Sequence, residues 1–331
     1  MIRNYFSRMD GHLQEVVKAA FSALVIRTFG TLLGFSVSVV IARLLGAEGS
    51  GIYYLALSVA TIAATVGRVG FDSTLVRFIA SHAFAHEWAD VRYIYRLAMK
   101  VVSAASLLIS VVLFLGSSWA ANIVFKKPFM EVPLQLAALA VMPAALAMVQ
   151  AESLRGLKSI PASQWIKTVF VSFGTLLLVY PLVKLWGANG AVAAYLAAVG
   201  VTVIVSWILW RRVYRGKAGM MDGRKAMMSL SQVFQSNGHL FGVALMGLVM
   251  QHTATILLGA WGSAHDVGVF YVASRIASLF LFPLMAMISI LAPKFAEIYR
   301  KGNMNELKNL SQSSSRILTL FVVPGALLVA E

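Results

Sequence analysis

The sequence contains no cysteine, and only 12% of its 331 residues are charged. The absence of cysteine excludes disulfides, thiolate metal sites and cysteine nucleophiles. The shortage of charge is equally informative, because a soluble domain carries about 25% charged residues. Hydrophobic residues make up 59% of the chain. A globular core cannot hide that much apolar surface, so lipid must be the solvent for a large part of it.

Motifs that support catalysis are also missing from the sequence. The six histidines have no zinc-ligand spacing, and there is no glycine-rich phosphate loop with a lysine. No loop carries an acidic cluster of the kind that holds magnesium. We therefore expect a protein that is not an enzyme and that holds no metal and no cofactor.

Apolar stretches of membrane-spanning length recur along the chain. A crossing helix needs about 20 mostly apolar residues. Eight stretches meet this requirement: 21–44, 51–70, 97–119, 132–152, 165–186, 187–210, 239–261 and 267–291. A ninth, 317–330, is shorter, so we expect the chain to be a fragment of a longer protein. The predicted fold class is an all-α membrane protein.

The distribution of basic residues predicts the orientation of these spans. The net charge is +15, and most lysines and arginines fall in alternate loops, which positive-inside bias places in the cytoplasm together with the N-terminus. Residues 1–20 are expected to form an amphipathic helix on that surface, or else a partly ordered tail. Topology and anionic membrane lipids thus explain the charge, and no nucleic-acid partner is needed. The predicted location is the bacterial inner membrane.

A repeat divides the predicted spans into two halves. The stretch Gly51-Ile-Tyr-Tyr-Leu-Ala56 matches Gly268-Val-Phe-Tyr-Val-Ala273 at an offset of 217 residues. Six spans separate the copies, so both enter the membrane in the same direction, and substrate is expected in a central cavity between the halves. The predicted organisation is a cytoplasmic segment, a six-helix bundle, a basic cytoplasmic linker and an incomplete second bundle, over residues 1–20, 21–210, 211–238 and 239–331.

Charged side chains inside spans are the first candidates for function, since each costs at least about 2.5–3.5 kcal/mol at a helix centre. Arg27 and Arg275 lie deepest, one in each half, and we predict that both face the cavity and bind an anionic ligand such as a pyrophosphate. Arg68 and Lys167 lie near span ends, where they either line the cavity or reach the interface as structural residues. The acidic residues Asp72, Glu152 and Asp266 fall at span ends, so none is an obvious buried partner.

Two polar residues in the middle of the seventh predicted span are further candidates. Gln251 and His252 either line the cavity, where they contact sugar hydroxyls or water, or form hydrogen bonds between helices. The sequence leaves both roles open.

Three segments carry a family resemblance. Ala42-Arg-Leu-Leu-Gly-Ala-Glu-Gly-Ser-Gly-Ile-Tyr-Tyr-Leu-Ala56 resembles the first outer turn of bacterial polysaccharide and O-antigen flippases. Val69-Gly-Phe-Asp-Ser-Thr-Leu-Val-Arg-Phe-Ile-Ala80 is similar to their second span and its loop, and Val267-Gly-Val-Phe-Tyr-Val-Ala-Ser-Arg275 to their eighth span. The resemblance implies two bundles that work by alternating access on a polyprenyl-pyrophosphate-linked oligosaccharide, as in O-antigen and lipopolysaccharide assembly. It also implies cavity arginines in the first and eighth spans, at positions comparable to Arg27 and Arg275.

Other functions are weighed against this resemblance. A cation-coupled multidrug and toxin antiporter of the same superfamily usually needs a buried carboxylate, whereas this sequence places cations in its spans. A membrane glycan polymerase or transferase is expected to carry a large catalytic loop, and none is visible. A scaffold for glycan-assembly proteins stays open, and such proteins are also expected partners of a flippase.

Overall fold

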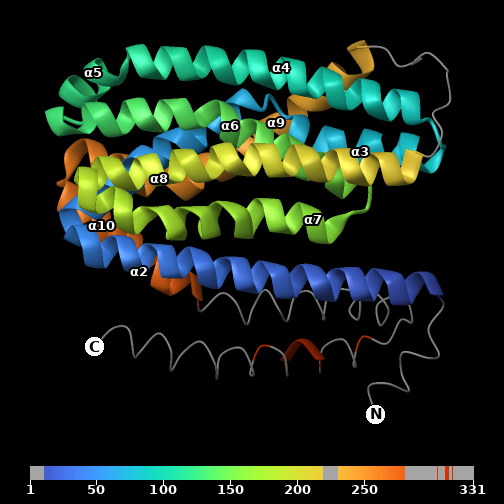
Figure 1. Ribbon diagram of the computed structural model, residues 1–331, viewed down its shortest axis with the longest axis horizontal. Coiled ribbons are helices and arrows are strands. Elements are labelled where there is room, and N and C mark those ends of the chain that lie inside the picture. The colour runs from blue at the N-terminus through green and yellow to red at the C-terminus, as the bar shows by residue number, and fades with distance from the viewer. Residues whose placement is uncertain (1–10, 219–229, 280–303, 305–309, 313–314, 316–331) are drawn as a thin grey trace. The chain divides into compact units, whose positions relative to one another are not determined.

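The computed structural model describes residues 11–218, 230–279, 304, 310–312 and 315, and among them it contains helices and no strand (Figure 1). The elements are α2 (Gly11–Gly67), α3 (Phe71–Phe84), α4 (Trp88–Leu115), α5 (Ser117–Trp119), η1 (Ala120–Val124), η2 (Pro128–Met130), α6 (Glu131–Gly156), α7 (Ile160–Gln164), η3 (Trp165–Phe170), α8 (Val171–Ala218), α9 (Leu230–Trp261) and α10 (Ala264–Leu279). The prediction of an all-α fold is confirmed.

The chain forms two compact units, Met1–Val269 and Phe270–Glu331, which are considered separately. The first holds every helix through α9 and the beginning of α10. The ninth predicted apolar stretch, the second part of the eighth (280–291) and much of the predicted linker (219–229) lie outside the described residues. The predicted division into segments and two parallel bundles stays a prediction.

Four helical segments of the described chain are long and apolar enough to cross a membrane: Ser22–Gly67, Trp88–Leu115, Pro128–Gly156 and Ile160–Ala218. The first contains 46 residues and the last 59. One crossing needs about 20 residues, so the first is more than twice and the last almost three times that length. Each is also broken once, at Gly46 with φ 66° and at Gly187 with φ 56°. Glycine adopts positive φ without steric cost, so one residue reverses the chain between two spans. The membrane-protein prediction is confirmed.

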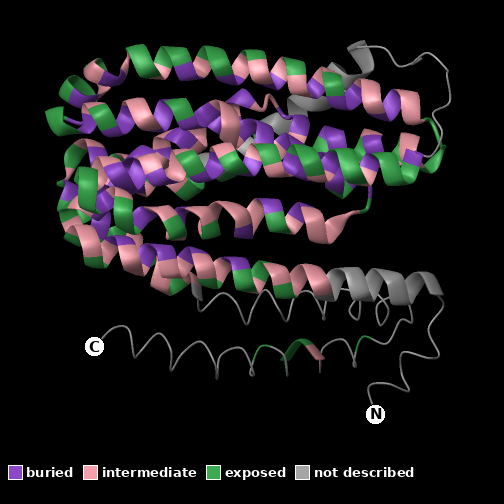
Figure 2. Ribbon diagram, in the orientation of Figure 1, coloured by how far each residue is buried: buried purple, intermediate pink, exposed green. Residues whose placement is uncertain are grey.

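Helix α6 lies at the centre of the first unit, where it packs against α2, α3, α4 and α8. In its most apolar window 56% of residues are buried, against 22–33% in the other three long segments. Figure 2 shows many exposed residues along α4 and α8. On α4 these include Leu107, Leu108 and Val112. Exposed apolar side chains on the outer helices suit contact with lipid, whereas the small residues of α6 suit contact with neighbouring helices.

One predicted loop is helical. Residues 71–84, expected as a charged cytoplasmic loop, form α3, which buries Phe71, Thr74, Leu75 and Ile79. These positions recur at intervals of one or two helical turns and therefore form one face. That face packs on α6, where a Cβ on Gly156 would lie only 2.8 Å from the Cβ of Ile79. Residues 71–84 therefore form a helix rather than a loop, because α6 offers a surface of small residues on which their apolar face packs.

Candidate functional site

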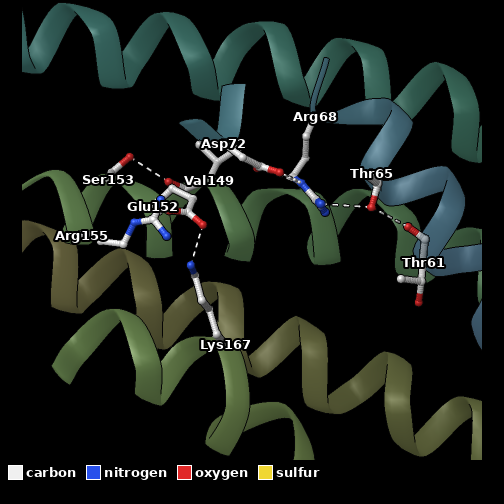
Figure 3. Close-up of polar contacts among 9 residues, drawn as sticks. All are labelled: Thr61, Thr65, Arg68, Asp72, Val149, Glu152, Ser153, Arg155 and Lys167. Carbon is white, nitrogen blue, oxygen red and sulfur yellow. Dashed lines mark hydrogen bonds and ion pairs between the residues drawn. The ribbon is translucent and has the colours of Figure 1, made fainter. Parts of the chain in front are cut away.

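A cluster of charged residues lies where α2, α3, α6 and η3 meet, at the end of the bundle shared by α3 and α7 (Figures 1 and 3). We call it the inner-end cluster, because the charge distribution predicts that this end faces the cytoplasm. Its members are Arg68, Asp72, Glu152, Arg155 and Lys167.

The turn between α2 and α3 positions the first ion pair. Val69 has φ 50° and Gly70 has φ 76°, and a positive φ is unusual for a β-branched residue such as valine. This tight turn brings Arg68 Nε within 2.9 Å of the Asp72 carboxylate. Arg68 Nη2 also donates to Thr65 Oγ1 at 3.0 Å. Backbone strain of this kind collects at functional sites, which makes the turn a candidate position for function.

The second group of charges surrounds Glu152, whose side chain is only 7% exposed. Lys167 Nζ donates to Glu152 Oε1 at 2.5 Å, and Arg155 Nε lies 3.0 Å from Oε2. Figure 3 shows Lys167 reaching Glu152 from the neighbouring element. Burial of an ion is favourable only when opposite charge compensates it, and here two cations do so. Glu152, whose place at a span end did not make it an obvious buried partner, is therefore a buried partner of both cations.

Lys167 belongs to the π-helical segment η3, which interrupts the path from α7 to α8. Such segments occur frequently at functional sites because they reorient side chains. The first half of α2 packs closely against this segment, since a Cβ on Gly30 would lie 2.5 Å from Thr168 Cβ. Arg27 lies one helical turn before Gly30 and is exposed.

The inner-end cluster contains three cations and two carboxylates and therefore carries a surplus positive charge. Both Arg68 and Lys167 already bind carboxylate oxygens, which resemble the oxygens of a phosphate in charge and geometry. An incoming phosphate can compete for these donors. The arrangement can thus bind an anion by exchange of partners.

The structure places the sequence-predicted candidates in three settings. Arg68 and Lys167 come together in the inner-end cluster, on adjacent elements. Gln251 is exposed and His252 half-buried, both on α9. Arg275 is half-buried on α10 in the second unit, whereas Arg27 belongs to the first. That Arg27 and Arg275 face each other across a cavity stays a prediction.

The repeated motif forms a contact that sequence reasoning did not foresee. A Cβ on Gly51 would lie 1.7 Å from the carbonyl oxygen of Ala264, and one on Gly268 would lie 2.0 Å from that of Ala47. Both contacts join residues of the first unit. The equivalent glycines of the two predicted halves therefore lie at one helix contact, where neither has space for a side chain.

Comparison with known proteins identifies the family of the chain. No curated protein matches the chain. A family described as polysaccharide biosynthesis protein matches residues 16–299, which include α3 to α9, the inner-end cluster and both repeated motifs. The match covers most of the 331 residues, so the chain belongs to the polysaccharide biosynthesis protein family.

Proposed function

We propose that the protein moves a polyprenyl-pyrophosphate-linked oligosaccharide from the cytoplasmic to the outer leaflet of the bacterial inner membrane by alternating access. The contact between Gly51 and Gly268 is the observation that carries this proposal. It joins corresponding turns of the two repeated motifs, as expected when two parallel halves surround a central path. Membership of a polysaccharide biosynthesis family supplies the substrate class.

The cationic residues have distinct roles in this proposal. Arg27 and Arg275 hold the pyrophosphate within the membrane, because a guanidinium binds two phosphate oxygens at once. Gln251 and His252 face the glycan or water. Arg68 and Lys167 lie nearer the predicted cytoplasmic end, where they receive the pyrophosphate as it enters.

In this scheme Glu152 occupies the cations while no substrate phosphate is bound. Its buried carboxylate keeps Lys167 and Arg155 in position and compensates their charge while no anion is bound. When a pyrophosphate arrives, Lys167 exchanges one anionic partner for another. Such an exchange limits the electrostatic cost of both the empty and the occupied states.

The buried position of Glu152 also favours a second candidate, a cation-coupled multidrug antiporter. Such a transporter uses a buried carboxylate to hold a proton or cation. Here two basic side chains already compensate the carboxylate, which leaves it less able to bind a cation. We therefore place the flippase first.

The test uses a bacterium that lacks its own glycan flippase and measures lipid-linked glycan in the periplasmic leaflet. We expect the wild-type protein to restore this glycan, and Arg27→Ala and Arg275→Ala to abolish restoration at equal membrane expression. Arg43→Ala is the matched control, because Arg43 is an exposed arginine of the same helix as Arg27. Restoration that survives both substitutions keeps the function and overturns the site. Absence of glycan transport, together with drug efflux that Glu152→Gln abolishes, would identify the antiporter.

A further inference from the structure

A second basic site lies between the beginning of α4 and the end of α8. Figure 1 shows these helix ends at the same end of the first unit as α3. The site is a cavity of about 380 Å³, within the range of about 300–1,000 Å³ typical of small-molecule sites. We call it the arginine–aromatic pocket. Its lining residues are Arg92, Tyr95, Arg96, Trp207, Trp210, Arg211, Tyr214, Arg215 and Ala218.

A stack of aromatic rings forms the rigid floor of this pocket. Tyr95 stacks on Trp210 with ring centroids 3.6 Å apart, and Trp210 stacks on Tyr214 at 4.9 Å. The Tyr214 hydroxyl donates to the carbonyl oxygen of Trp88 at 3.0 Å, which ties α8 to the first turn of α4. All three stacked rings are buried. The floor of the pocket is therefore preorganised by α4 and α8.

The four arginines are arranged in two pairs on facing helices. Arg92 and Arg96 are four residues apart on α4, as are Arg211 and Arg215 on α8, so each pair lies on one helix face. The guanidinium of Arg211 lies 3.6 Å from the Trp207 ring centroid, which fixes its position by a cation–π contact. No carboxylate belongs to the lining residues. Like charges four residues apart destabilise a helix, and an anion between the pairs relieves that repulsion.

The surroundings of the pocket indicate which anion it takes. Trp207 is exposed, and the exposed apolar residues Val201 and Ile204 precede it by one to two turns on α8. A tryptophan beside arginines is typical of the membrane interface, where a headgroup meets its acyl chains. A lipid whose phosphate lies in the pocket can thus place its acyl chains along α8.

We propose that the arginine–aromatic pocket binds the phosphate of an anionic membrane lipid in the predicted cytoplasmic leaflet. The lipid's phosphate lies between the arginine pairs of α4 and α8, and its chains follow the exposed apolar face of α8. The site is separate from the inner-end cluster and does not depend on the transport proposal. Two lipids offer this chemistry, an anionic phospholipid and a polyprenyl pyrophosphate, and the experiment distinguishes them.

The test measures lipid binding to the purified protein by native mass spectrometry, with phosphatidylglycerol and undecaprenyl pyrophosphate titrated separately. The test variant is Arg211→Gln with Arg215→Gln. The matched control is Arg77→Gln with Arg212→Gln, which removes two exposed arginines outside the pocket lining. Loss of charge-assisted hydrogen bonds is expected to weaken binding of the tightest lipid about tenfold or more in the test variant. The control is expected to bind as the wild type does.

The outcomes separate the alternatives. Weakening of phosphatidylglycerol binding assigns the site to a phospholipid, whereas weakening confined to undecaprenyl pyrophosphate assigns it to the carrier lipid. Equal weakening in test and control variants would show general surface electrostatics and overturn the proposal, as would no weakening in either. Quenching of wild-type tryptophan fluorescence in phosphatidylcholine vesicles gives an independent measurement. Brominated phosphatidylglycerol should quench at a lower mole fraction than brominated phosphatidylcholine, and equal quenching contradicts the site.

Discussion

Gly51 and Gly268 pack reciprocally, each against the carbonyl oxygen of the residue four positions before the other, Ala264 and Ala47 respectively. Exchanging the two helix turns converts each contact into the other. The two turns are therefore related by a local twofold axis. The sequence repeat predicted that the two motifs are equivalent, but it did not predict that they are in contact. Substitutions at the two glycines should therefore have equivalent effects.

We expect Gly51→Ala and Gly268→Ala each to destabilise the protein by about 1–3 kcal/mol, because an added methyl forces the backbones apart. The double variant should lose less stability than the sum, since the second methyl enters a contact that the first has already opened. Thermal unfolding in detergent measures both effects. Gly200→Ala is the control, because nothing lies within 4 Å of its Cβ position. Strict additivity would contradict the reciprocal contact.

The ion pair of Glu152 and Lys167 gives a second prediction. Loss of one partner leaves a buried charge uncompensated, so Glu152→Gln and Lys167→Gln should each cost roughly 3 kcal/mol. Arg155 supplies some compensation and reduces these losses. The double variant, which buries neither charge, should be more stable than either single variant. The free energy of unfolding in denaturant, measured for all four proteins, gives the coupling energy.

Arg155→Gln is the control for this cycle, because the Arg155 side chain is 42% exposed and water screens its contribution. We expect a loss of less than about 1 kcal/mol for this variant. If the double variant is as unstable as the two single losses combined, the two residues do not act as a pair.

A third prediction concerns Lys127, a buried lysine in the connection before α6. Its Nζ donates to the carbonyl oxygens of Gly259 at 2.6 Å and Gly262 at 2.8 Å, and so ties this connection to the end of α9. Lys127→Met leaves these acceptors unpaired and should cost about 1–3 kcal/mol. Lys126→Met, at the exposed neighbour, should have little effect. Thermal unfolding of both variants tests the difference.

Lys127 should also make stability depend on pH in the alkaline range. Burial lowers the pKa of Lys127 below its ordinary value of 10.5, although the charge of Asp266 partly opposes this shift. Between the two values the unfolded chain binds more protons than the folded one, so the free energy of unfolding should rise with pH. The stability of wild type relative to Lys127→Met should therefore increase as the pH approaches 10.5 from neutrality. A decrease would mean that the buried amine keeps its proton.

The fourth prediction concerns the beginning of α10, where Ser263 and Asp266 form a capping box. Asp266 Oδ2 accepts hydrogen bonds from the backbone N–H of Ser263 at 2.9 Å and from its hydroxyl at 2.7 Å. These bonds favour the carboxylate and lower the pKa of Asp266 below its ordinary value of 3.8. The resulting stabilisation is present above pH 3.8 and is lost as the pH falls through the lowered pKa.

Asp266→Asn should consequently lower the thermal midpoint at neutral pH and should differ little from wild type at a pH well below 3.8. Ser263→Ala removes the other half of the cap and should lower the midpoint at both pH values. A difference between Asp266→Asn and wild type that persists in acid would show that the charge of Asp266 is not the stabilising feature.

Hydropathy placed the predicted spans up to residue 210 on the four long apolar segments, because membrane length and apolarity are local properties of the sequence. It even located the glycine breaks, between predicted spans at Gly46 and at the edge of one at Gly187. It missed α3, since the apolar face of that helix is narrow and its mean composition resembles a loop. The amphipathic spacing of Phe71, Leu75 and Ile79 was the available signal.

The site was less predictable, because its partners are distant in sequence. The depth of Lys167 in its span was evident, but its partner Glu152 lies fifteen residues earlier, across the turn between two packed helices. Gly156 and Pro161 between them signalled that turn, which would have placed both residues at the same end of the bundle. Likewise, Arg211 and Arg215 served only to predict orientation, because the residues that complete their pocket, Arg92, Tyr95 and Arg96, come from another helix, α4.

The glycine reversals at Gly46 and Gly187 leave little of the chain outside the membrane at the predicted outer ends of these spans. At each of them one non-helical residue separates two spans. The chain therefore offers no loop there that an antibody or a phage could bind or a protease could cleave. Among the described residues, the connection at residues 116–130 is the longest chain reversal on that predicted outer side. An epitope tag for labelling whole cells therefore belongs in this connection, placed so that Lys127 keeps its contacts with the end of α9.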